Sequence, residues 1–161
     1  SLRRAYEHGA DKSAREDMAL ASLFGGLALA NAGLGAVHGF AAPIGGMFPA
    51  PHGAVCAALL PGVMAANVRA LRERMPDSPA LRRYEEVARV LTGRPQATAE
   101  DGVTWTADLC RVLEIPPLRL WGLGALDVNA VVPKAMQASS MKANPVQLSE
   151  AELRDVLAAA R

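Results

Sequence analysis

The chain has 161 residues, of which 51% are hydrophobic and 20% are charged, and its formal net charge is +1. This length is enough for one domain with a sizeable core, and the 4% aromatic content predicts a core built from Ala, Leu, Val and Met. A near-neutral chain without a basic, aromatic-rich stripe is not typical of nucleic-acid binding. Two cysteines, Cys56 and Cys110, do not form a disulfide framework. We interpret both as buried thiols of a cytoplasmic protein.

Helical patterns run along the whole chain and predict an all-α, multi-helix domain over residues 1–161. No run of alternating strand residues and no Gly-rich loop after a strand occurs, so the sequence carries no dinucleotide- or phosphate-binding fingerprint. In chain order we expect helices at Leu2–His8, from Asp11 or Ser13 to Ala32, around His38 as far as Ile44, at 52–73, 78–92, 100–113 and 127–138, and from Ser149 to the C-terminus.

Capping residues predict where several of these helices begin and end. Ser78 followed by Pro79 is a strong helix start, and Gly93 marks the end of the same helix. Asp127 is expected to cap a later helix, and the Ser149–Glu152 pair has the spacing of a capping box.

The segment from Met18 to Val68 contains no Asp, Glu, Lys or Arg. Its first part, Met18–Val37, is about long enough to span a bilayer. Ser22, Asn31 and His38 interrupt the apolar run, and the prolines that follow break it. We therefore expect a buried central helix of a soluble domain rather than a membrane span.

Two histidines, His38 and His52, stand fourteen residues apart within this uncharged segment. On one unbroken helix they would be separated by about 21 Å along the axis, so they share a site only if the chain turns between them. Gly45-Gly46 weakens a helix there, and Pro49 and Pro51 disfavour its continuation. Because neutral imidazole is the commonest metal ligand in proteins, the pair predicts a metal site held by two consecutive helices.

The motifs around these histidines resemble the signature of the iron-containing (group III) alcohol dehydrogenases. The similarity runs in order through most of the chain. It is carried by the segments Ala14-Arg-Glu-Asp-Met-Ala, Asn31-Ala-Gly-Leu-Gly-Ala-Val-His38-Gly, Pro43-Ile-Gly-Gly, Pro51-His52-Gly, Leu59-Leu-Pro-Gly-Val-Met-Ala-Ala-Asn67 and Asn144-Pro145.

The resemblance implies an enzyme of dehydroquinate synthase-like fold, with an N-terminal α/β domain that binds NAD or NADP and an all-helical C-terminal domain with a divalent metal. The metal is usually iron(II) and sometimes zinc. Its four ligands are an Asp and a His one helical turn apart and two further His, which His38 and His52 match. The metal polarises the oxygen of a small alcohol or aldehyde substrate as a Lewis acid, and hydride passes to the nicotinamide.

The sequence departs from the family pattern in two respects. The Asp-x-x-x-His pair lies upstream of the His38 motif in the family, and no Asp of this chain has a His four residues later. We therefore expect this chain to correspond to the C-terminal domain without its first helices and to be inactive alone. We also expect the missing parts to leave apolar surface exposed, so that the chain forms a homo-oligomer. Many members also have a second His at the position of Ala42, so no proton-relay role is assigned there.

Two further residues occupy positions that look like the substrate pocket wall of the family, Leu29 and Ser140. A plain core leucine and a loop serine are the alternative interpretations. The function itself also has alternatives. One is a relative such as a maleylacetate reductase or a glycerol dehydrogenase. The other, from a different class, is a non-catalytic helical module that no longer binds metal.

Overall fold

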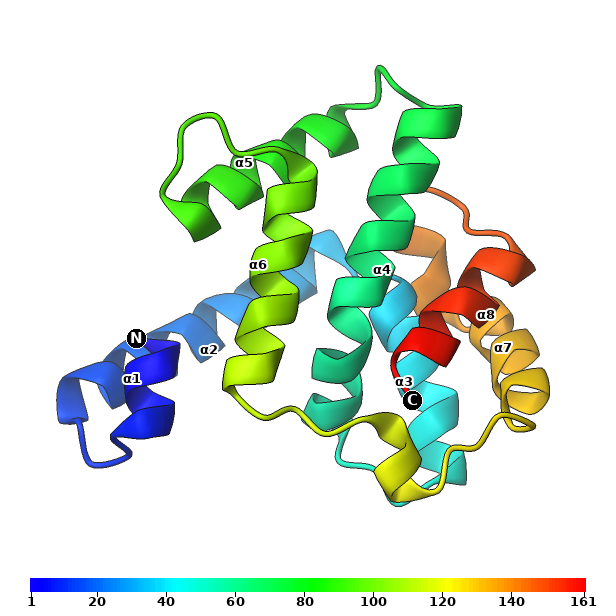
Figure 1. Ribbon diagram of the computed structural model, residues 1–161, viewed down its shortest axis with the longest axis horizontal. Coiled ribbons are helices and arrows are strands. Elements are labelled where there is room, and N and C mark those ends of the chain that lie inside the picture. Colours follow the sequence, from blue (N-terminus) through cyan, green and yellow to red (C-terminus); the bar gives the residue numbers. More distant parts are fainter.

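The longest helix, α4, passes through the middle of the computed structural model, which describes residues 1–161 (Figure 1). Helices α5 and α6 pack together and against one side of α4, whereas α3 and α8 pack against its other side and are joined by α7. No residue is in a β-strand, so the all-α prediction is confirmed. The elements are α1 (Leu2–Glu7), α2 (Lys12–Ala32), α3 (Ala36–Met47), α4 (His52–Arg74), α5 (Pro79–Thr92), α6 (Ala99–Val112), the 3-10 turn η1 (Leu118–Trp121), α7 (Val128–Gln137), the 3-10 turn η2 (Ser139–Ala143) and α8 (Glu150–Ala159).

The main core lies between α3, α4, α7 and α8. It is aliphatic, as the composition predicts, except for one fully buried ring, Phe40. Burial of such side chains contributes about 25 cal/mol per Å² of apolar surface, which fixes α3 against α4. The largest fully buried side chains of this core are Phe40, Ile44, Val55, Leu59, Leu71, Leu118, Leu123, Val131, Val132, Leu153 and Leu157.

Most of the predicted helix ends are confirmed by hydrogen bonds. The Asp11 side chain accepts from the Ala14 amide, and Ser78 accepts from the amide of Ala80. Gly93 adopts the left-handed conformation at the end of α5. The capping box at Ser149 is formed in both directions.

One predicted helix end and one predicted cap bond were wrong. Helix α3 was expected to reach Ile44, but it continues through Gly45 and Gly46 to Met47. Both glycines face open space, so their cost is only the modest one of Gly in a helix. Asp127 was expected to cap α7, but its carboxylate makes no cap bond and instead accepts from the Gly124 amide at 2.7 Å, closing the preceding loop.

By length and composition, α4 is apolar enough to cross a membrane, and so is the pair α2 and α3, which bends by 104°. Half of the most apolar part of α4 is buried inside the domain. A core helix of a soluble protein can be equally long and apolar, because its apolar residues face other helices.

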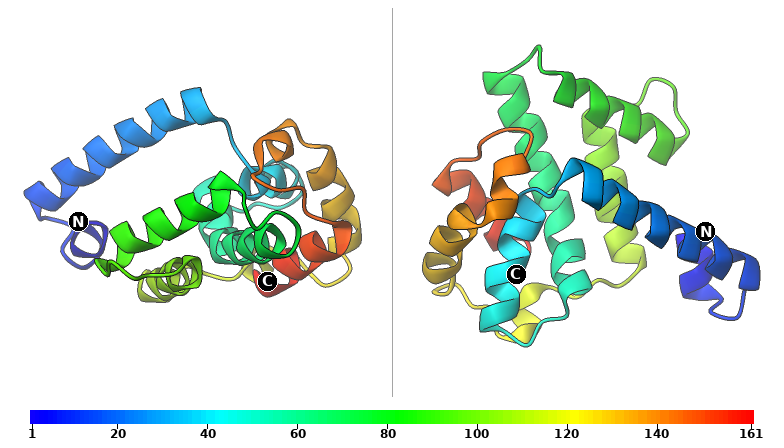
Figure 2. Two further views of the ribbon diagram at one scale, coloured as in Figure 1. Left: turned by 90° about the horizontal axis from the view of Figure 1, so that it is seen from above. Right: turned by 180° about the vertical axis from the view of Figure 1, so that it is seen from behind.

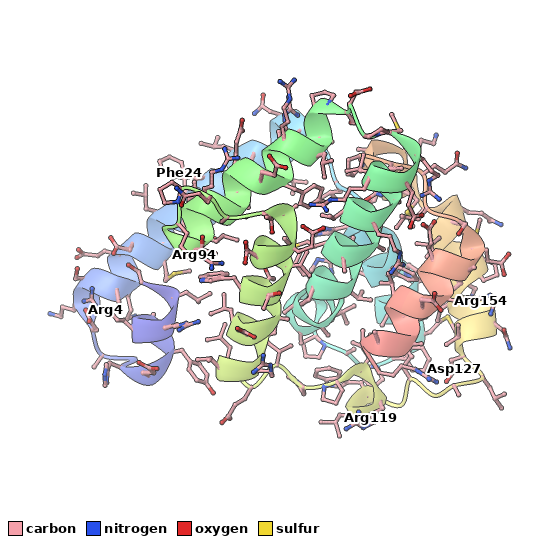
Figure 3. All side chains as sticks on the ribbon, turned by 45° about the horizontal axis from the view of Figure 1, so that its top comes forward. Arg4, Phe24, Arg94, Arg119, Asp127 and Arg154 are labelled. Atoms are coloured by element: carbon pink, nitrogen blue, oxygen red, sulfur yellow. The ribbon has the colours of Figure 1, made fainter.

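Helix α2 has almost no buried surface, since Ala14 is its only buried residue. The expectation of a buried central helix at Met18–Val37 was therefore wrong: the helix ends at Ala32, and its apolar residues after Met18 lie exposed. It extends as an arm away from the main core (Figure 2), and Phe24 lies on the opposite side of the molecule from Arg154 on α8 (Figure 3). Large apolar side chains recur on one face of this arm at a spacing of three and four residues, each at least 50% exposed: Leu20, Leu23, Phe24 and Leu27. We call these four residues the α2 apolar face.

We predict that the chain self-associates through the α2 apolar face, because contiguous exposed apolar surface of this kind marks an interface. Leu23→Glu combined with Leu27→Glu should shift the chain to a monomer in light scattering at micromolar concentration. Leu126→Glu is the control, since Leu126 is 85% exposed but lies outside this face. A monomeric unmodified chain would contradict the prediction.

Candidate metal centre

His38 and His52 are brought together by the reversal between α3 and α4. His38 lies in the first turn of α3, and His52 is the first residue of α4. Phe48 ends α3 in an extended conformation, with φ −132° and ψ 148°. A residue before proline is disfavoured in the helical region, so Pro49 fixes this extended residue and Pro51 leads into α4. The prolines, rather than the two glycines, make the turn.

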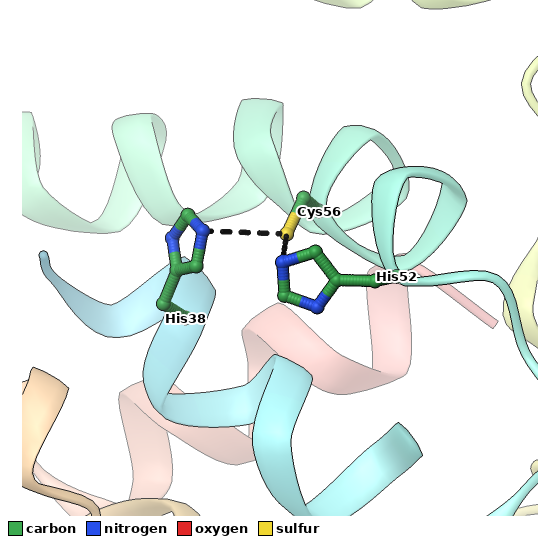
Figure 4. Close-up of side chains that lie close together, drawn as sticks. All are labelled: His38, His52 and Cys56. Carbon is green, nitrogen blue, oxygen red and sulfur yellow. Dashed lines mark hydrogen bonds between the residues drawn. The ribbon is translucent and has the colours of Figure 1, made fainter. Parts of the chain in front are cut away.

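The two imidazole rings face each other across this reversal, with their centroids 5.3 Å apart. Cys56, one helical turn after His52, lies between them (Figure 4). Its Sγ is 3.5 Å from Nε2 of His52 and 3.8 Å from Nε2 of His38. One ring nitrogen from each histidine and the sulfur lie within 4.8 Å of one another. The predicted convergence of His38 and His52 is therefore present in the fold.

The surroundings of His38 and Cys56 favour their neutral forms. Burial, and secondarily the charge of His52, lowers the pKa of His38, which favours the neutral ring with a lone pair for a ligand. Burial raises the pKa of the Cys56 thiol. Imidazole nitrogen and thiolate sulfur are both ligands of zinc and iron, so the donor set fits a divalent ion.

A cavity of about 470 Å³ borders His38 and Cys56. It lies between the start of α3, the middle of α4 and the segment after η2. Its wall is mainly apolar, with three polar side chains, Asn67, Tyr84 and Asn144, grouped together.

These polar side chains form a network that fixes the start of α3. Asn67 is only 2% exposed, and its amide nitrogen donates to the Tyr84 hydroxyl and the Asn144 side-chain oxygen. Asn144 donates to the Asn67 side-chain oxygen and the Val146 carbonyl, both at 2.7 Å. The Ala36 amide, two residues before His38, donates to the Asn144 oxygen at 3.1 Å. The network therefore ties the His38 backbone to α4 and to the segment before α8.

Comparisons with known proteins identify the family to which this sequence and fold belong. The sequence profile described as "Fe-containing alcohol dehydrogenase family, C-terminal" matches residues 1–161. The chain belongs to the Fe-containing alcohol dehydrogenase family. It is 34% identical to Alcohol dehydrogenase 4 of Saccharomyces cerevisiae (strain YJM789) over 154 residues, which are 95% of this chain and 38% of that protein. It is 33% identical to Lactaldehyde reductase of Escherichia coli (strain K12) over 91% of this chain and 37% of that protein.

Solved structures of iron-type alcohol dehydrogenases have the same helical arrangement. The structure of 1,3-propanediol oxidoreductase superposes with a TM-score of 0.87 at 30% identity, over 99% of this chain and 41% of that one. The alcohol dehydrogenase from Oenococcus oeni gives a TM-score of 0.85 at 28% identity, over 100% of this chain and 41% of that one. The chain thus spans about two fifths of the length of these relatives and corresponds to their C-terminal helical domain.

The remaining candidate residues of this iron-type dehydrogenase domain lie apart from the cavity. Leu29 is 46% exposed on α2, and Ser140 is half-buried in η2. Neither lines the cavity beside His38, and their substrate role stays a prediction. Ala42, one turn after His38 on α3, is exposed.

The sequence interpretation missed Cys56 and Asn144 as parts of this site. Cys56 follows His52 by four residues, a spacing that places both on one helix face, so the signal was present. Asn144 was read only as a turn residue and as part of the family resemblance. Its partners Asn67 and Ala36 are 77 and 108 residues away in sequence, and no local pattern reveals such contacts.

We predict that Asn144→Ala lowers the free energy of unfolding by about 2 kcal/mol, because it leaves the buried Asn67 amide and the Ala36 amide without their acceptor. Urea denaturation measures this change. Asn129→Ala is the matched control: Asn129 is exposed and accepts only from Arg154, so its effect should stay within about 0.5 kcal/mol. Equal effects of the two substitutions would contradict the role of the network.

Proposed function

We propose that this chain is the metal-binding part of an NAD(P)-dependent alcohol dehydrogenase that interconverts an alcohol and an aldehyde or ketone. The observation that carries the proposal is the approach of His38 and His52 to a ring separation of 5.3 Å in a chain of this family. The names of the relatives, which include alcohol dehydrogenases and a lactaldehyde reductase, support this reaction class over a non-catalytic module.

His38 and His52 would hold a divalent ion, iron(II) or zinc, on two helices whose spacing the Phe48–Pro51 turn fixes. When bound, the ion supplies Lewis-acid polarisation of the alcohol oxygen. The lowered pKa of His38 keeps its ring available as a ligand, because a protonated imidazole has no lone pair to donate. The aliphatic core between α3 and α4 fixes the two helices that carry these rings.

The cavity of about 470 Å³ beside His38 is the proposed position of the substrate. Its mainly apolar wall includes Val37, Leu60 and Met64, which suits the hydrocarbon part of a small alcohol. The Asn67–Asn144 network borders the same cavity and orients the backbone that carries His38.

The rest of the enzyme is proposed from the relatives, since the chain covers about two fifths of their length. Residues 1–161 form a single helical domain, and NAD or NADP is bound mainly by a separate α/β domain. We propose a cytoplasmic homo-oligomer that acts on small alcohols or aldehydes, with no nucleic-acid or membrane partner.

We predict that the metal affinity of this chain depends on both histidines. His38→Ala and His52→Ala should each weaken Zn²⁺ or anaerobic Fe²⁺ binding about tenfold or more, because loss of a direct ligand costs at least as much as loss of a supporting group. Isothermal titration and elemental analysis give the affinity and stoichiometry. His8→Ala is the control, since His8 is exposed at the end of α1. Unchanged binding in the His38 and His52 variants would refute the centre.

We also predict that the 161-residue chain alone does not reduce NAD or NADP with an alcohol above the rate of its His38→Ala variant. A chain extended to the full length of the relatives should do so, and His38→Ala in that longer chain should abolish the reaction. Absorbance of the reduced nicotinamide follows both chains. An inactive full-length, metal-loaded protein would favour the non-catalytic alternative.

A further inference from the structure

The two cysteines of the chain have different surroundings. Cys110 on α6 lies with its Sγ 3.5 Å from the Ala57 carbonyl oxygen, the usual weak contact of a half-buried thiol. Cys56 has as its polar neighbours the Nε2 atoms of His52 and His38. The sulfur of Cys56 therefore lies close to one ring nitrogen of each histidine, and all three atoms are possible metal donors.

The distances agree with a shared ion. Metal–nitrogen bonds of about 2.1 Å and a metal–sulfur bond of about 2.3 Å in a tetrahedral site separate nitrogen from sulfur by about 3.6 Å. The observed separations from the Cys56 sulfur are 3.5 Å to His52 and 3.8 Å to His38. All three donors lie within 4.8 Å of one another, so an ion can contact them with only small side-chain adjustments.

We propose that Cys56 is a metal ligand, so that His38, His52 and Cys56 form a three-donor centre for a thiophilic divalent ion such as Zn²⁺. The inference rests on the proposed metal centre and adds a sulfur ligand to it. As the sulfur–metal bond forms, the thiol proton leaves to solvent, and the charge of the thiolate partly neutralises that of the ion.

The sulfur ligand has a consequence for metal choice. Most sites already bind zinc or cobalt more tightly than iron(II). Thiolate is softer than imidazole or carboxylate, so a thiolate ligand increases this difference in affinity. The three donors of this chain leave further coordination positions of the ion open, and the cavity beside His38 and Cys56 adjoins the cluster on one side. The metal specificity of this chain is then set by a residue of α4 that lies one turn after His52.

Co²⁺ titration of the unmodified chain tests the proposal, because a cobalt–thiolate bond gives an intense near-ultraviolet charge-transfer band that histidine ligands do not give. We expect the band to saturate at one ion per chain. Cys56→Ser should remove the band and weaken Co²⁺ binding about tenfold or more. Cys110→Ser is the matched control and should keep both. In anaerobic competition, Cys56→Ser should also reduce the preference for Zn²⁺ over Fe²⁺ about tenfold.

The outcomes separate this inference from the proposed function. Stoichiometric Co²⁺ binding without the band, and with equal affinity in Cys56→Ser, would overturn the sulfur ligand and leave the His38–His52 centre in place. No binding of Co²⁺ or Zn²⁺ by the unmodified chain would overturn the three-donor centre, and the same titration of the full-length protein would then test the proposed function separately. Circular dichroism of each variant reports whether it folds.

Discussion

The reversal between α3 and α4 is the constraint on which the rest of the site depends. His38 and His52 are separated by thirteen intervening residues, and only a sharp turn places their rings 5.3 Å apart. Pro49 forces the residue before it out of the helical region, and Pro51 leads directly into α4. Aliphatic packing of α3 on α4 then fixes the separation of the two helices, because buried side chains interdigitate with little free volume.

Polar groups inside so apolar a segment need partners, and the structure provides them in two places. Asn67 satisfies its amide through Tyr84 and Asn144, which avoids the cost of an unpaired buried group. His38 and Cys56 have each other and His52 instead. The first set satisfies buried polar atoms and stabilises the fold, whereas the second brings three possible metal donors close together. Both sets border the same cavity, so the structural network supports the chemical one.

The sequence predicted the helical class, the caps at Ser78 and Ser149, and the histidine pair, because these depend on local spacing and on the cost of burying polar groups. It offered Asp11 or Ser13 as the cap of α2, and the structure shows Asp11. It placed the end of α3 too early, since Gly45 and Gly46 lower helix propensity only modestly and packing of α3 outweighs them. It assigned Asp127 to a cap, whereas the carboxylate binds the nearer Gly124 amide. The Asn144 contacts join segments distant in sequence, and only the folded chain reveals them.

Metal binding by the proposed centre would be thermodynamically linked to folding of the α3–α4 reversal. All three proposed donors lie within nineteen residues, from His38 to Cys56, so an ion bound by them closes a short loop whose entropic cost is small. An ion that binds only the folded form stabilises it by about 2.7 kcal/mol when its concentration is one hundred times the dissociation constant. This stabilisation would favour the folded α3–α4 turn, which brings the three donors together. The local spacing that makes the ligands recognisable in the sequence is thus also what allows the ion to stabilise their arrangement.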